Sequence, residues 1–115
     1  MTSGIIQTLS YSFAKDIVGL YSQIVSIEKE FVISKQILKS GTSITANIVE
    51  AQSATSKKEF TYKLSIGLRE ARETLFWIQL INDTNLYLNL TIGGYENDCN
   101  KIIGLVRIIK KSKHD

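Results

Sequence analysis

Apolar residues recur along this chain at alternating steps of four and three positions. The first series, near the N-terminus, is Leu9, Phe13, Ile17, Leu20, Ile24 and Ile27. Because an α-helix has about 3.6 residues per turn, this spacing places the apolar side chains on one face of a helix that buries a single stripe. The pattern predicts a first helix over residues 9–29, preceded by a flexible N-terminal arm at residues 1–8.

Three later segments repeat this spacing. The second helix is expected at residues 34–53, with Ser34 as its N-cap and an inward series of Ile37, Gly41, Ile44, Ile48 and Ala51. The third is expected at residues 57–81, with the series Phe60, Leu64, Leu68, Ala71, Leu75 and Ile78. The fourth is expected at residues 91–112, before a C-terminal tail at 113–115, with the series Ile92, Tyr95, Cys99, Ile102, Val106 and Ile109.

The segments that connect these helices also have recognisable sequence patterns. Ser56 and Glu59 have the spacing of a capping box, which predicts the start of the third helix. Residues 82–85 are a cluster of helix-breaking residues, and residues 28–30 are expected to be a solvated patch. The alternating stretch at 86–94 resembles a strand but has no partner strand, so we interpret it as a turn. The sequence therefore predicts one all-α domain, an antiparallel up-down four-helix bundle with short connections.

The third helix has an unusual second face, opposite its buried stripe. A solvated face would carry mostly Lys, Glu and Gln, but this one includes large aromatic side chains. Its members are Tyr62, Ile66, Arg69, Glu73, Phe76 and Trp77. Exposed apolar surfaces of this size usually contact a partner, and we therefore expect these residues to form an interface between copies of the chain. The alternative is a splayed bundle in which this face contacts the N-terminal arm.

Several polar residues are expected to have structural roles. Asn47 lies at the edge of the apolar stripe of the second helix, which predicts a hydrogen bond to a neighbouring helix; a ligand contact is the alternative. Glu50 is expected to pair with Arg69 or Arg72 on the third helix. Glu70 belongs to an E-A-R-E run that favours ion pairs within one helix or with a neighbour.

The chain is mildly basic, with 14 Lys and Arg against 11 Asp and Glu and a net charge of +3. Much of the excess lies near the C-terminus, where cations stabilise a helix by complementing its dipole. The same residues could hold a phosphate backbone if several subunits combined their charges. The candidate nucleic-acid-binding residues are Lys57, Lys58, Lys63, Arg107, Lys110, Lys111 and Lys113.

The residues that common catalytic and metal sites require are nearly absent. His114 is the only histidine and Cys99 the only cysteine, which is too few for a zinc site or a disulfide. A Cys-His pair would need an ordered His114, and chains usually fray so close to the C-terminus. We expect a non-enzymatic protein with no cofactor, no metal and no small-molecule substrate. No secretory signal or membrane-length apolar run is found, so a cytoplasmic location without membrane contact is expected. A carrier that binds a small molecule near Asn47 is a further alternative.

Two segments resemble a known family. SITANIVEA, followed by KKEFTYKLSIGLREARETLFWIQLI, is similar to the four-helix-bundle proteins encoded in intervening sequences of bacterial large-subunit ribosomal RNA genes. The family's S-I-x-x-N-I-x-E-G segment is matched at Ser43, Ile44, Asn47, Ile48 and Glu50, with Ala51 in place of the glycine. Its E-A-R-E-T-x-[YF]-W-L segment is matched at residues 70–74, 76 and 77, with Ile78 for leucine. The resemblance covers residues 9–112.

This resemblance implies an assembly and a class of partner. The family is similar in fold to the accessory protein of diversity-generating retroelements, and both form ring-like pentamers of four-helix bundles. The accessory protein binds nucleic acid and a reverse transcriptase through basic surface, whereas the activity of the intervening-sequence proteins is undefined. The resemblance therefore implies a homopentamer that binds RNA or DNA, or a nucleoprotein partner. The alternative is a protein-interaction scaffold that binds no nucleic acid.

Overall fold

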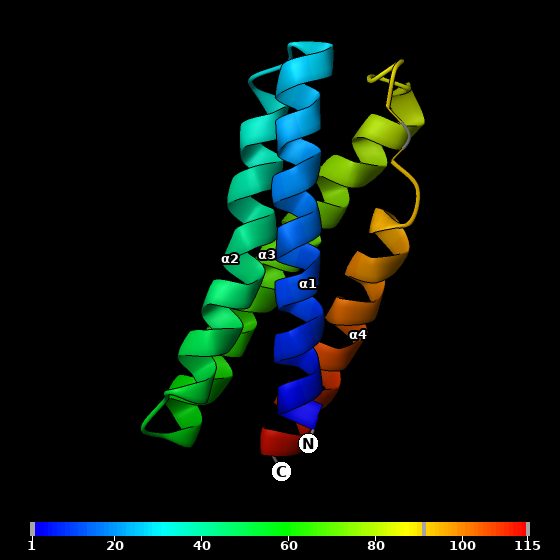
Figure 1. Ribbon diagram of the computed structural model, residues 1–115. Helices are drawn as coiled ribbons and strands as arrows, with labels where there is room; N and C mark the ends of the chain where they lie inside the picture. The colour runs from blue at the N-terminus through cyan, green and yellow to red at the C-terminus, as the bar shows by residue number, and fades with distance from the viewer. Residues whose placement is uncertain (1, 91, 115) are drawn as a thin grey trace.

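Four helices run alternately up and down along one long axis in the computed structural model (Figure 1). They are α1 (Thr2–Gln23), which continues into the short π-helix η1 (Ile24–Glu28), then α2 (Ile33–Gln52), α3 (Lys57–Thr84) and α4 (Tyr95–His114). The structure describes the backbone of residues 2–90 and 92–114, and the side chains of residues 4–90 and 92–112. The predicted all-α, antiparallel four-helix bundle is confirmed.

The order of helices around the bundle determines which surfaces lie apart. α2 packs against α1 and α3, and α4 likewise packs against α1 and α3. α1 and α3 therefore occupy opposite corners, and in Figure 1 α1 passes in front while α3 passes behind. Because the chain reverses direction at each turn, α1 and α3 also run the same way.

The core consists of the apolar series that the spacing singles out. One fully buried side chain from each helix illustrates it: Ile17 in α1, Ile48 in α2, Leu64 in α3 and Ile102 in α4. Ile27 is the exception, because it is 48% exposed although it continues the series of the first helix. It lies in η1, whose wider turns shift the residues that follow Ile24 away from the core face.

The helix boundaries differ from the expected ones at three places. The expected N-terminal arm is helical from Thr2, and Ile6 in its second turn is fully buried in the core. α3 continues to Thr84, so the breaker cluster forms its last turn. Asn85 then adopts a left-handed conformation (φ 50°), and the amides of Asn85 and Leu86 bond back to carbonyls of the last turn, which is a Schellman cap.

α4 begins at Tyr95 rather than 91, directly after Gly94, whose φ of +88° suits a glycine. Thr91, where the sequence predicted its start, lies outside the described residues. The expected tail at 113–115 lies outside the residues whose side chains are described.

Glu30, expected to be solvated, caps α2. Its carboxylate accepts hydrogen bonds from the backbone N–H groups of Val32 (2.8 Å), Ile33 (2.7 Å) and Ser34 (2.9 Å). The prediction that Ser34 is the cap is wrong, because Ser34 is buried and its hydroxyl donates to the Glu30 carbonyl oxygen. A carboxylate at this position satisfies amides that the first turn of a helix leaves unpaired.

Two carboxylates just before α2, those of Glu28 and Glu30, also bind the connection between α3 and α4. The Tyr87 hydroxyl donates to Glu30 Oε1 at 2.6 Å, and the Asn89 amide donates to Glu28 Oε2 at 3.0 Å. We call this end of the bundle, formed by residues 27–32, 85–90 and 92–94, the linked end. Its two loops are far apart in sequence and fixed to each other by carboxylates.

Candidate functional site

The start of α3 and the end of α4 lie together at the other end of the bundle. A surface pocket of about 410 Å³ is lined by Ser56, Lys57 and Phe60 on one side and by Ser112 on the other. The start of α3, with Lys57 and Lys58, therefore lies at the same end of the bundle as the last turns of α4, with Arg107, Lys110 and Lys111. We call this group the basic end; its members are Lys57, Lys58, Arg107, Lys110 and Lys111.

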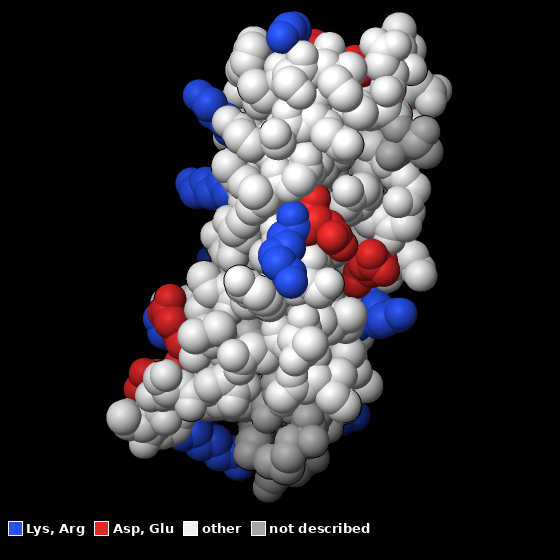
Figure 2. Space-filling model, viewed as in Figure 1, with Lys and Arg blue, Asp and Glu red and all other residues white. Residues whose placement is uncertain are grey.

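The basic end combines exposed cations from two helices. Lys57, Lys58, Arg107 and Lys111 are exposed and Lys110 is half-buried. In Figure 2 blue side chains lie on both sides of the lower end of the molecule. Lys113, the remaining C-terminal candidate, lies outside the described side chains.

Lys63 differs from the other candidates because it is paired. Its ammonium lies 2.7 Å from a carboxylate oxygen of Glu50, the only salt bridge among the described side chains. The hydrogen bond and the negative charge of Glu50 raise the pKa of Lys63. The predicted pairing of Glu50 with Arg69 or Arg72 is therefore wrong, and the charge of Lys63 is largely compensated.

The register of the α2–α3 hairpin explains this choice of partner. Residues equally far from the turn meet in an antiparallel pair, as Lys63 and Glu50 do. Further along, the Thr74 hydroxyl donates to the Ser40 hydroxyl at 2.8 Å in the buried interface of the two helices. Arg69 and Arg72 lie level with the middle of α2, about two turns away from Glu50 along the helix axis.

The outer side of α4 extends the basic surface. Gly104, Arg107, Ile108 and Lys111 line a hollow of about 280 Å³, and Ile108 is 61% exposed. Lys101 is also exposed and lies on the same face, two turns before Ile108. Lys101 was not among the predicted binding residues, although the sequence shows its spacing from Gly104, Ile108 and Lys111 in steps of three and four.

The second face of α3 is exposed, as a regular stripe. Tyr62 and Phe76 are 59% and 52% exposed, and the steps between successive members are four and three. We call this set the outer stripe; it consists of Tyr62, Ile66, Arg69, Glu73, Phe76 and Leu80. Trp77 is only a flanking residue. It is half-buried against the core, donates a hydrogen bond to Glu73 at 3.2 Å, and has its ring 4.9 Å from that of Phe76.

The predicted structural polar residues behave differently from expectation. Asn47 donates its side-chain N–H to the Ser43 carbonyl of its own helix at 2.8 Å rather than to a neighbouring helix. Partial burial and the nearby charge of Glu73 raise the pKa of Glu70, against the opposing effects of Lys39 and Arg69. Arg72 is exposed, and no ion pair of the E-A-R-E run forms among the described side chains.

The remaining chemistry of the described residues is limited. Cys99 is buried and donates to the Ala71 carbonyl at 3.1 Å, and burial raises its pKa to about 12, so the thiol stays protonated at neutral pH. No group of three or more His, Cys, Asp or Glu side chains in the described part of the chain could hold a metal ion. No described helix combines the length and apolar content needed to cross a membrane.

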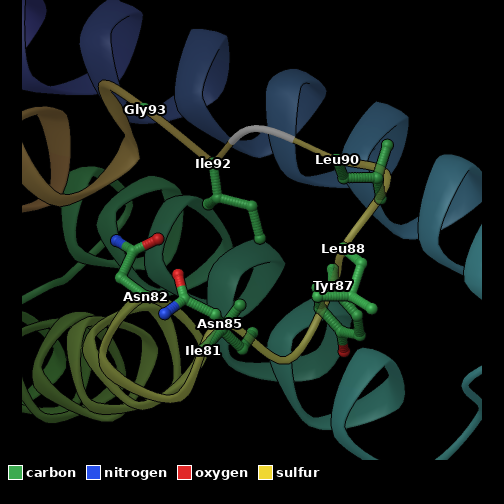
Figure 3. A pocket seen from close by; sticks show the side chains of 8 residues that line it. All are labelled: Ile81, Asn82, Asn85, Tyr87, Leu88, Leu90, Ile92 and Gly93. Carbon is green, nitrogen blue, oxygen red and sulfur yellow. The ribbon is translucent and has the colours of Figure 1, made fainter.

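A groove of about 530 Å³ lies at the linked end (Figure 3). Asn82 and Asn85, from the end of α3, lie on one side of it, and Leu88 and Leu90, from the following connection, lie on the other. The groove is near the start of α2, whereas Asn47, the residue proposed for a ligand contact, lies near its end. The groove and the predicted contact are therefore separate.

Fold and surfaces together define a small antiparallel helical bundle with a basic end and an aromatic outer stripe. The model of the 23S rRNA-intervening sequence protein family matches residues 4–107, and the chain belongs to this family. The predicted resemblance is thus confirmed.

A solved structure supports the same assignment. The chain is 44% identical to a protein of unknown function of the S23 ribosomal protein family from Bacteroides thetaiotaomicron VPI-5482. The TM-score is 0.89, and the similarity covers 96% of this chain and 99% of the other. Comparison with curated proteins finds no match.

Proposed function

We propose that this protein is a homo-oligomer that binds RNA or DNA, alone or in a nucleoprotein, through its basic end. The observation that carries the proposal is the presence of cations from both α3 and α4 at one end of the bundle. None of the five residues of the basic end forms an ion pair with a described side chain. Lysine and arginine side chains of this kind bind phosphate without reading base sequence.

Helix stability alone explains only part of this arrangement. Cations in the last turns of α4 complement its dipole. Lys57 and Lys58 lie instead in the first turn of α3, where the positive end of the dipole makes a cation unfavourable. Their position therefore favours a role in binding over a role in stabilising the helix.

Self-association would strengthen such binding. The outer stripe exposes Tyr62 and Phe76, with the half-buried Ile66 beside them, on a face that a monomer would cover with polar side chains. We propose that the stripe is a subunit interface, and the family resemblance favours a pentamer. Several basic ends in one particle would bind a polyanion together, with an avidity that a single end lacks.

The experiment measures retention of mixed RNA and of duplex DNA at increasing salt. The variant Lys57→Gln/Lys58→Gln should weaken binding of either polymer and reduce the slope of log K against log salt by about 1.8 for a duplex. Lys35→Gln/Lys39→Gln, two exposed lysines of α2 near the linked end, is the matched control and should leave the slope unchanged. If the wild-type protein retains neither polymer at low salt, nucleic-acid binding is excluded.

A second candidate is a scaffold that binds another protein and no nucleic acid. It is favoured by the linked end, where Val32 and Leu88 are 73% and 84% exposed. Both proposals are non-catalytic and place the protein in the cytoplasm. A Lys57→Glu/Lys58→Glu variant that keeps its protein partner in a pulldown, with no binding of RNA by the wild type, would favour the scaffold.

A further inference from the structure

The outer face of α1 is unusual for a solvated helix. Among the described side chains of α1, Lys15 and Asp16 carry its only charges. Tyr11 and Val18 are 58% and 50% exposed. Figure 2 shows this side of the molecule, on which the surface over α1 is uncharged except for one cluster about half-way along.

The exposed residues of this face repeat the spacing of the outer stripe. In both, successive members are separated by four, three, four, three and four positions. We call this set the α1 face; it consists of Gly4, Thr8, Tyr11, Lys15, Val18 and Ser22, all exposed. Two helices with such stripes can pack along a common seam.

We infer that the α1 face of one subunit binds the outer stripe of the next subunit, with the two helices parallel. This inference rests on the self-association proposed above and specifies the surfaces that meet. A parallel alignment sets Glu73 opposite Lys15 and Phe76 opposite Val18. It also brings Tyr62 to Gly4, where a large side chain meets a position without one.

Charge distinguishes the parallel from the antiparallel alignment. In the parallel alignment, Arg69 lies level with Tyr11. The Tyr11 ring can bind a cation, since within the free subunit the Lys15 ammonium lies 5.1 Å from the ring centre. Lys15 can then pair with Glu73. In the antiparallel alignment Arg69 would face Lys15, and the two positive charges would repel.

A contact of α3 with α3 is the main alternative. Two outer stripes related by a two-fold axis could pair Arg69 with Glu73. That contact leaves Tyr11 and Val18 exposed in every subunit, whereas the contact between α1 and α3 covers both surfaces. The head-to-tail contact therefore accounts for more of the exposed apolar surface.

The inferred contact has a consequence for the whole assembly. Each subunit uses two different surfaces at opposite corners of its bundle, so the contact repeats into a ring or an open chain. Because α1 and α3 run the same way, all subunits point in one direction. Every basic end then lies on the same side of the particle, where the ends can bind one nucleic acid together.

The test uses two matched variants at exposed positions. Phe76→Glu alters the outer stripe and Val18→Glu alters the α1 face. Each variant alone should sediment as a single subunit and keep the helical circular dichroism of the wild type. An equimolar mixture should form a species of two subunits and nothing larger, because each variant retains one intact surface.

Other outcomes distinguish a failure of the contact between α1 and α3 from a failure of self-association itself. If the wild type associates and Val18→Glu does so equally well, or if the mixture remains single subunits, the contact between α1 and α3 is wrong. If the wild type itself is a single chain, self-association is wrong as well.

A charge exchange tests the alignment. Lys15→Glu and Glu73→Lys should each weaken association at least about tenfold. The double variant should return to within about threefold of the wild type. A double variant as weak as the singles would contradict the pairing of Lys15 with Glu73.

Discussion

The two ends of this bundle are held together by different kinds of contact. At the basic end, α3 starts with a local cap: Ser56 Oγ accepts from the Glu59 amide at 3.0 Å, and Glu59 reaches back to the Thr55 hydroxyl at 3.1 Å. At the linked end, Glu30 caps α2 and also binds Tyr87, far along the chain. The first cap is local in sequence, whereas the second connects three elements.

This difference bears on what each end can do. The cap of α3 leaves Lys57 and Lys58 exposed in the turn that it starts. At the linked end, Glu30 and Glu28 instead bind the long connection between α3 and α4, in which Leu88 is exposed. The basic end is therefore free to contact a polyanion, while the linked end presents a fixed apolar surface.

The largest expected effect is the loss of the Glu30 carboxylate. Glu30→Ala removes the acceptor for three backbone amides and for Tyr87. It should lower the free energy of unfolding by about 2 kcal/mol, after allowance for partial solvent exposure. Urea unfolding followed by circular dichroism measures this change. A loss below about 0.5 kcal/mol would show that the connection is held by apolar packing alone.

A smaller effect is expected when Glu30 is protonated rather than removed. Partial burial raises its pKa, but hydrogen bonds from Tyr87 and the backbone outweigh burial, and the net pKa is lowered. A lowered pKa in the folded state adds stability above the pKa of the unfolded chain, and this stability is lost as pH falls through the folded value.

The difference in stability between wild type and Glu30→Gln should therefore be constant near neutral pH and shrink on acidification. The pH range over which this difference shrinks lies below the ordinary glutamate pKa of about 4.3. Urea unfolding at several pH values measures it. Glu28→Gln, which leaves the Glu30 cap of α2 intact, is the control. A difference that grows at low pH would contradict the assigned pKa direction.

The same contrast explains which parts of the structure the sequence predicted. The helix pattern and the Ser56–Glu59 cap depend on neighbours within a turn or two, and both were predicted correctly. The bond between Glu30 and Tyr87 joins distant parts of the chain, and nothing local marks that pair. The cap that Glu30 forms on α2 is local, but it was assigned to Ser34 instead. Residues 1–8 were expected to be an arm because their small polar residues obscure Ile6, which becomes buried only when the bundle assembles.

The candidate surfaces follow the same rule. The outer stripe was visible in the sequence because its residues belong to one helix, although Trp77 was placed on it and turns partly toward the core. The meeting of Lys57 with the end of α4 required the fold. The pairing of Lys63 with Glu50 required the register of two antiparallel helices, which periodicity alone does not determine.

The smallest expected effect is at the local cap of the basic end. Ser56→Ala removes the acceptor for one backbone amide of α3 and should cost about 1 kcal/mol in urea unfolding, half the loss expected for Glu30→Ala. Because Glu59 still accepts from Thr55, the first turn of α3 should fray without moving the linked end.

Hydrogen exchange distinguishes the effect of Ser56→Ala from that of Glu30→Ala. Ser56→Ala should speed exchange only at the start of α3, whereas Glu30→Ala should also speed exchange at Asn89, whose amide Glu28 holds against the adjoining turn. Equal and widespread acceleration in both variants would mean that the two ends unfold as one unit and that local and long-range caps contribute alike.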